Sequence, residues 1–210
     1  MKPRVLYIVL IMVSQFAFSS GMQSDDSVKT NMQLFRDGIV TLTDSIFNRL
    51  PNEKRNSIVV SIQMIEELSF VSQTIVSELQ SKGVQVFIES TTVTPSFLEL
   101  QINSPELRIS YGDSFRESFL GETKANRTVT VSLPFLAKDV QSNSVLQSGT
   151  LLYNYSDTVS TDMISLLEQQ GIPSTHAPMP ERNFFDRLLE PLIIIGATGV
   201  AVYLFFHVRS

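Results

Sequence analysis

The chain ends in a run of uncharged residues, and this run constrains the possible topology more than any other feature. Residues 192–206 contain no charged side chain, and the uncharged stretch continues to residue 208. A helix over 192–208 would be about 25 Å long, at the low edge of a membrane span. A buried core helix normally shows a polar stripe, whereas only Thr198 falls outside the apolar and glycine residues of 192–206. The run therefore predicts a transmembrane helix over 191–208, with Pro191 in its first turn.

The N-terminus has the pattern of a secretory signal peptide. "MKPR" supplies positive charge, "VLYIVLIMV" is apolar, and Ala17 and Ser19 supply the small residues that signal peptidase needs. These features predict a signal peptide over 1–19 and a mature chain that begins at Ser20. An uncleaved membrane helix is the alternative, and the apolar core is short for it.

The two ends together predict a single-pass protein of the cell membrane. The body would lie outside the cytoplasm, in the bacterial periplasm, and Arg209 would keep the C-terminus in the cytoplasm. Two alternatives stay open for the tail. It could be a glycolipid-anchor signal, although those tails normally end in apolar residues, or a sorting tail through which the body is released.

Composition excludes several classes of function. The formal charge is −5, and it is near −7 without residues 1–19, which hold two of the sixteen basic residues and none of the acidic ones. An acidic body repels phosphate backbones, so we expect no nucleic-acid partner. The chain has no cysteine, which excludes disulfides, thiolate catalysis, cysteine-ligated metals and a lipid-acylated cysteine.

The first half of the body alternates helix and strand patterns. An apolar stripe at helical spacing ends at Pro51 and predicts a helix; its members are Phe35, Ile39, Leu42, Ile46 and Leu50. "SIVVSI" at 57–62 and "VQVFI" at 84–88 are typical of buried strands. A helix with Gly83 as its C-terminal cap lies between them, so the two strands should be parallel.

The second half alternates apolar and polar residues, as strands do. Strands are expected at 97–102, 107–111, 127–133 and 148–155, with "NSPE" as a turn between the first two, and a helix at about 158–170. The predicted fold is α/β (α+β), over residues 20–170. It has a single mixed sheet of about five or six strands packed by about three helices. A Pro-rich spacer at 171–182 and an interfacial helix segment at 183–190 would lead to the membrane.

No pattern of catalytic, cofactor-binding or metal-binding residues emerges, and none is predicted. His176 lies in the spacer and His207 at the membrane edge, so neither joins a rigid site. The helix after the first strand opens with Glu66 and Glu67 instead of a phosphate-binding glycine loop. An acid pair for glycoside chemistry would have to come from Glu99, Glu106, Asp113 or Glu117. Glu99 and Glu106 fall on the polar phase of alternating strands, where charged residues usually face water.

Two further patterns concern modification and self-association. Asn126 and Asn154 each begin a glycosylation tripeptide, which matters only in a eukaryotic host. Ala197 and Ala201 form a small-xxx-small pair in the C-terminal helix, which allows a homo-oligomer through close helix packing.

The segment "NSIVVSIQMIEELSFVSQTIVSELQSKGVQVFI" and the later "SVLQSGTLLYNYSD" resemble a group of bacterial envelope domains. These are the domains of curli-secretion and flagellar accessory lipoproteins and the amino-terminal domain of the Tol-Pal periplasmic protein. The resemblance covers about 57–157 and rests on the order of strands and helices. The chain departs from the lipoproteins by lacking the acylated cysteine and by its own C-terminal span. The resemblance implies assembly or binding, with another envelope protein as partner.

The favoured hypothesis is therefore a membrane-anchored extracytoplasmic binding or assembly module without catalytic activity. A membrane-tethered envelope hydrolase is the alternative, as is a surface protein sorted and released through its tail. The binding module needs no cluster of titratable groups, whereas a hydrolase does.

Overall fold

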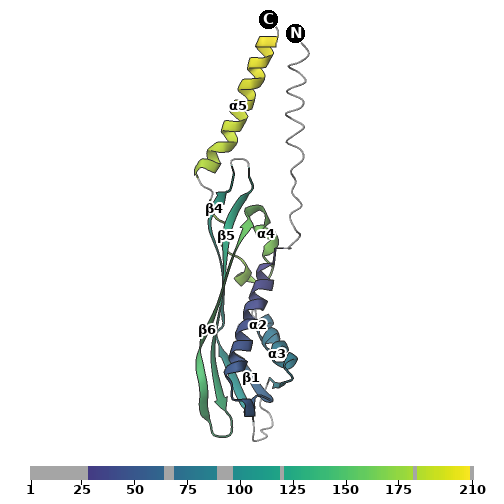
Figure 1. Ribbon diagram of the computed structural model, residues 1–210, viewed down its shortest axis with the longest axis vertical. Helices are drawn as coiled ribbons and strands as arrows, with labels where there is room; N and C mark the ends of the chain where they lie inside the picture. Colours follow the sequence, from purple (N-terminus) through teal and green to yellow (C-terminus); the bar gives the residue numbers. More distant parts are fainter. Residues whose placement is uncertain (1–27, 64–68, 89–96, 119–120, 182–183, 209–210) are drawn as a thin grey trace.

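The computed structural model describes residues 28–63, 69–88, 97–118, 121–181 and 184–208. They form a mixed sheet of six strands, with α2 and α3 side by side over one of its faces (Figure 1). This confirms the predicted mixed α/β architecture with a single sheet. The predicted signal peptide over 1–19, and Glu66 with Glu67, lie outside the described residues.

Helix α2 (Asn31–Arg49) begins at a capping box. The Thr30 hydroxyl accepts a hydrogen bond from the backbone N–H of Gln33 at 3.2 Å, and the Gln33 side chain accepts one from Thr30 N–H at 2.8 Å. All five residues of the predicted apolar stripe are buried. The helix ends at Arg49, and Leu50 is its C-terminal cap directly before Pro51, where the helix is predicted to stop.

The next unit runs from β1 (Ser57–Gln63) through α3 (Ser69–Ser81) to β2 (Gln85–Phe87). Gly83 has φ +79°, the left-handed conformation that a glycine cap supplies without strain. Strands β1 and β2 are parallel, with Ser57 opposite Gln85. The predicted β-α-β unit is thus confirmed.

Strands β3 (Leu98–Asn103) and β4 (Glu106–Arg116) do not form the predicted hairpin. Both run antiparallel to β5 (Thr123–Asp139), so together they make one interrupted strand along one side of β5. Three residues, 103–105, lie opposite only two residues of β5, 133–134. The extra residue in the β3–β4 line forms a bulge, which bends that line. Ser104, at φ +48°, and Pro105 make this kink, so "NSPE" bends the chain without reversing it.

Strand β6 (Ser144–Ser160) pairs with β5 along its whole length, from Lys124 to Asp139. Neighbouring strands follow the order β2-β1-β3-β5, and β4 pairs with β5 on the same side as β3, farther along the strand. Strand β6 pairs with the other side of β5. The main core lies between this sheet and the helices, with buried side chains that include Phe35, Ile58, Ile75, Leu100 and Val131.

The predicted helix at 158–170 is wrong over most of its range. Residues 158–160 continue β6, because their partners in β5 extend to Lys124. A short 3₁₀ turn follows at η3 (Thr161–Met163), and α4 (Ile164–Leu167) is one turn long. Within this turn Leu166 is 68% exposed, while Ile164 and Leu167 are buried.

Part of the predicted spacer packs on the body. The turn η4 (Pro173–Thr175) places Thr175 in a fully buried position, where its hydroxyl donates to Ile172 O at 2.8 Å. Glu168 accepts hydrogen bonds from the His176 ring at 2.9 Å and the Ala177 N–H at 3.3 Å. These contacts hold residues 172–177 against the domain.

Helix α5 (Phe184–Val208) extends beyond the end of β4 (Figure 1). No helix in the described part of the chain is both long and apolar enough to cross a membrane, so the predicted transmembrane span over 191–208 is not supported. The uncharged part of α5 is short, because the charged residues Asp186, Arg187 and Glu190 occupy the first two turns of the helix. The uncharged remainder is about 25 Å long, against a hydrocarbon layer of about 30 Å.

Candidate binding site at the sheet edge

Strand β6 is an outer strand of the sheet along all seventeen of its residues. In the described chain its only strand partner is β5, so one row of backbone N–H and C=O groups faces away from the sheet (Figure 1). Such a row is a template for pairing with another strand. The outer side of β6 is therefore the first candidate for a binding site, and it is called the β6 edge below.

The β6 edge lacks most of the features that protect exposed strands. Its sequence, "SVLQSGTLLYNYSDTVS", has no lysine, arginine or proline. Its single charged residue, Asp157, points to the neighbouring strand. One irregularity occurs where Ala137 faces Gln147 and Lys138 faces Val145, which leaves Leu146 unopposed. From Gln147 to Ser160 the strand is regular and open to pairing.

The two faces of β6 carry different side chains. Leu151, Tyr153 and Tyr155 lie on the helix-covered face and pack against the main core while remaining partly exposed. The opposite face carries Leu152, which is 63% exposed, together with exposed serine, threonine and asparagine residues. An added strand would thus meet apolar side chains on one face and a polar face with one central leucine on the other.

A buried ion pair fixes β6 to its neighbour. Arg127 in β5 has no exposed side-chain surface, and it donates to the Asp157 carboxylate from Nε at 2.9 Å and from Nη2 at 2.5 Å. Nη1 donates to Lys29 O at 2.9 Å and to Asn31 Oδ1 at 2.8 Å. A buried guanidinium needs this full set of acceptors, because an unpaired buried charge is costly.

The polar network continues from Asn31 at the start of α2. Its side-chain amide donates to the Tyr111 hydroxyl at 3.1 Å and to Thr175 O at 2.8 Å. Burial raises the pKa of Tyr111, and the hydrogen bond with Asn31 opposes the rise. The network therefore joins α2, β4, β5, β6 and the segment around η4 into one rigid support for the β6 edge.

Helix α2 touches β6 at a glycine. A Cβ atom on Gly38 would lie 2.7 Å from Tyr153 Cδ1 and 2.9 Å from Val131 Cγ2. Only glycine lets the helix approach the tyrosine ring this closely. Burial and the nearby carboxylate of Asp37 raise the pKa of Tyr153, and Asp37 itself pairs with Lys29 at 2.7 Å.

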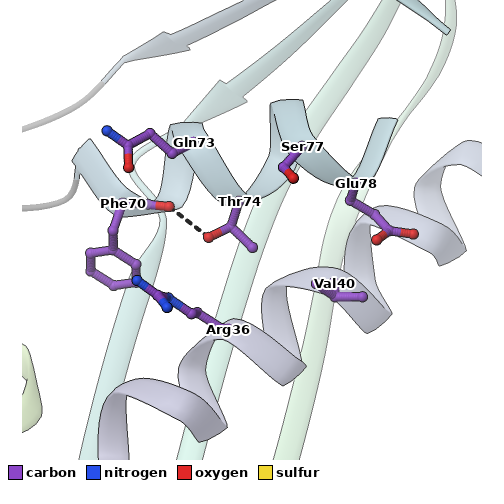
Figure 2. Close-up of a pocket in the computed structure, with 7 residues that line it drawn as sticks. All are labelled: Arg36, Val40, Phe70, Gln73, Thr74, Ser77 and Glu78. Atoms are coloured by element: carbon purple, nitrogen blue, oxygen red, sulfur yellow. Dashed lines mark hydrogen bonds between the residues drawn. The ribbon is translucent and has the colours of Figure 1, made fainter. Parts of the chain in front are cut away.

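An open groove of about 300 Å³ lies between α2 and α3 (Figure 2). It is lined by Arg36, Val40, Phe70, Gln73, Thr74, Ser77 and Glu78. Two of its polar groups are already engaged, because the Thr74 hydroxyl donates to Phe70 O at 2.7 Å and Glu78 pairs with Lys82 at 3.2 Å. The groove can seat a side chain of a partner, but it holds no convergent set of polar groups.

The carboxylates considered for acid–base chemistry do not gather. Glu99 and Glu106 lie seven residues apart along the β3–β4 line, roughly 20 Å, whereas glycosidase carboxylates lie about 5–10 Å apart. Glu99 accepts a hydrogen bond from Gln101 at 2.8 Å, and Glu117 pairs with Lys124 at 3.0 Å. Asp113 is exposed in β4. Within the described ranges, no group of acidic and histidine side chains is placed to hold a metal ion.

The asparagines of the glycosylation tripeptides lie in strands. Asn126 accepts a hydrogen bond from Thr158 at 3.0 Å, and Asn154 accepts one from Thr130 at 2.9 Å. Both pairs cross from β5 to β6 on the exposed sheet face.

Ala197 and Ala201 are exposed in α5, and their predicted packing against another helix stays a prediction.

The sequence contains a signal for the buried charge of this ion pair. Arg127 has the same strand phase as the inward-facing Val129, Val131 and Leu133, so a charge at that position had to face the core. The exposed β6 edge had no such signal, because strand order is set by pairings between distant segments.

Comparisons with known proteins give distant structural matches. No protein-family model matches the chain, and a search of curated proteins finds no relative. A minor lipoprotein from Acinetobacter baumannii matches at 15% identity and TM-score 0.33, over 52% of this chain and 69% of its own. Rare lipoprotein B from Shewanella oneidensis matches at 12% identity and TM-score 0.31, over 70% and 99%.

A third solved structure is a neuraminyllactose-binding hemagglutinin homolog from Helicobacter pylori. It matches at 11% identity and TM-score 0.33, over 53% of this chain and 69% of its own. Two of these three structures are bacterial lipoproteins. At these TM-scores the similarity carries no conclusion about a ligand or a partner, so the function has to be argued from the site itself.

Proposed function

We propose that this protein is a non-catalytic binding and assembly module of the cell envelope. It is attached to a membrane by α5, and it binds a protein partner by strand pairing at the β6 edge. The observation that carries the proposal is the seventeen-residue outer strand, whose one charge is turned inward to Arg127. Backbone hydrogen bonds would supply affinity, and the side chains on the two faces would supply specificity.

Membrane attachment is supported by the surface of α5. The described side chains of this helix are exposed on all sides, and the large apolar ones include Ile194, Ile195, Val200, Val202, Leu204, Phe205 and Phe206. An apolar surface of this kind does not stay in water and marks contact with lipid or protein. The signal-peptide pattern at 1–19 supports an extracytoplasmic location for the body.

Absence of turnover is supported by the positions of the titratable groups. Glu99 and Glu117 are engaged with neighbouring side chains. Glu99 lies in β3, Glu106 lies in β4 and Glu117 follows the end of β4, so these carboxylates do not converge. The His176 ring contacts Glu168 and Gln169 O at 2.9 and 3.0 Å, so both of its nitrogens are occupied in holding the segment around η4.

Site-specific photo-crosslinking in cells of the source organism tests the binding site. A benzoylphenylalanine at position 152 should give a defined crosslinked product, identified by mass spectrometry. The same group at position 166 should not, because Leu166 is similarly exposed, at 68%, but lies away from the edge. Equal products from both positions, or none from position 152, would rule out the β6 edge as the binding site.

A further inference from the structure

We infer that the partner at the β6 edge is a second copy of this chain, paired antiparallel through β6 about a two-fold axis at Leu152. This inference rests on the proposed function and names its partner. Leu152 is the middle residue of Ser144–Ser160, so an axis there pairs the greatest length of the two strands. Two-fold pairing of identical outer strands is antiparallel, and each copy presents the same surface to the other.

The sequence around Leu152 is complementary to itself in this register. On the helix-covered face, Leu151 of one copy meets Tyr153 of the other, a favourable aliphatic–aromatic pair. Gly149 of one copy lies opposite Tyr155 of the other, and because glycine has no side chain there is room for the tyrosine ring. These side chains are partly exposed in the single chain and would gain cover from the second copy.

The opposite face is also matched. Thr150 of one copy lies opposite Asn154 of the other, and the two side chains can hydrogen-bond. Leu152 of one copy packs against Leu152 of the other. Leu152 is 63% exposed in the single chain, in the middle of an otherwise polar face. Self-pairing about this residue explains why a large apolar side chain occupies that position.

Charge does not oppose the pairing. Asp157 is the single charged residue of β6, and in this register it meets Gln147. The two copies of Asp157 lie ten residues apart along the paired strands, roughly 33 Å, and each is neutralised by its own Arg127. A lysine or a central acid would have brought like charges together, which is how many outer strands prevent association.

The pairing has a consequence for α5. Glu181 O accepts a hydrogen bond from the Ser114 hydroxyl at 2.7 Å, and Ser114 lies in register with Ala125 and, across β5, with Val159. The chain therefore leaves the body at the Val159 end of β6. In the antiparallel pair these exits lie at opposite ends, roughly 45 Å apart. Because α5 extends beyond this end of the body (Figure 1), the pairing places the two α5 helices at opposite ends of the dimer, where each would contact its own membrane surface, whereas packing through Ala197 and Ala201 would bring them together.

The natural chain has no cysteine, so single cysteines can test the register. In full-length protein in mild detergent, Leu152→Cys should form a disulfide-linked dimer under mild oxidation, because directly opposed residues lie about 4.5–5.5 Å apart between Cα atoms. Leu166→Cys, with similar exposure, should remain monomeric, and Ala201→Cys should not crosslink if the α5 helices are apart.

A mixture distinguishes this register from random collision. A Ser148→Cys chain mixed with a differently tagged Ser156→Cys chain should give mainly the mixed dimer, since these exposed positions oppose each other. Crosslinking of Leu152→Cys no faster than Leu166→Cys would overturn the inference, as would homodimers of Ser148→Cys as abundant as the mixed dimer. If copies do not crosslink but photo-crosslinking at position 152 captures a different protein, the second-copy inference is wrong and the proposed function stands. If neither product forms, both are wrong.

Discussion

Asp157 of β6 accepts two hydrogen bonds from the guanidinium of Arg127 in β5, at 2.9 and 2.5 Å. The single charge of the outer strand is thus held by its own sheet and leaves the edge neutral. The same arginine also holds the start of α2, through Lys29 O and Asn31. One buried residue therefore supports both the stability of the domain and the composition of its candidate binding edge.

Removal of this carboxylate should be costly. Asp157→Ala leaves a fully buried guanidinium without its counter-charge, and we expect the free energy of unfolding to fall by about 3–5 kcal/mol. Asp37→Ala, which breaks the exposed pair between Lys29 and Asp37, should cost much less, because water screens an exposed ion pair. Urea unfolding of both variants measures the difference, and equal losses would show that the buried pair has no special role.

A glycine substitution tests the contact between α2 and β6. Gly38→Ala should gain about 1 kcal/mol in helix propensity but lose about 1–3 kcal/mol by clashing with Tyr153 and Val131, so the protein should be less stable. Gly112→Ala in β4 is the control, because its Cβ would lie 3.7 Å from Asn126 O, an ordinary contact away from the β6 edge. Stabilisation by Gly38→Ala would mean that the ring moves aside at little cost.

Stability should depend on the ionisation of Asp139. Hydrogen bonds from Lys54 and Ser142, together with the N–H of Gln141, lower the pKa of this carboxyl. A lowered pKa in the folded state stabilises the fold above the unfolded pKa, and this contribution is lost as the pH falls below about 4. Between pH 6 and pH 3, the wild type should therefore lose more stability than Asp139→Asn. Parallel losses in urea titrations would exclude this contribution.

Attachment to lipid should depend on the apolar surface of α5. Lysine in place of Ile195 and Val202 together should abolish flotation of the full chain with phospholipid vesicles, because each lysine places a charge on the apolar surface that would contact the lipid. The variant Leu166→Lys also replaces an exposed apolar side chain by lysine, but outside α5, so it should float like the wild type. Flotation of the α5 variant at the wild-type level would show that another surface binds the lipid.

Local patterns in the sequence were enough to predict the elements that one periodicity governs. The stripe from Phe35 to Leu50 and the cap at Gly83 follow directly from helix geometry. The kink at Ser104 was mistaken for a turn, because "NSPE" contains the residues that turns use and the strand register that makes it a bulge comes from β5. Residues 158–160 were mistaken for helix for the same reason, since their strand state depends on distant partners.

The candidate site was less predictable than the fold. The phase of Arg127 indicated a buried charge, but its partners Asp157 and Asn31 are about thirty and a hundred residues away. An outer strand has no sequence pattern of its own, because "SGTLLYNY" would suit a central strand equally well. Strand order alone makes β6 a candidate binding surface.

The size of the native complex tests the β6 edge most directly. Full-length wild type, Leu152→Lys and Leu166→Lys would be extracted from membranes in mild detergent and compared by size-exclusion chromatography with light scattering. Both substitutions are at exposed positions, so neither should unfold the protein. We predict that Leu152→Lys, which places a charge at the centre of the edge, reduces the complex to single chains, while Leu166→Lys leaves it at the wild-type size. A Leu152→Lys complex of wild-type size would contradict binding at the β6 edge.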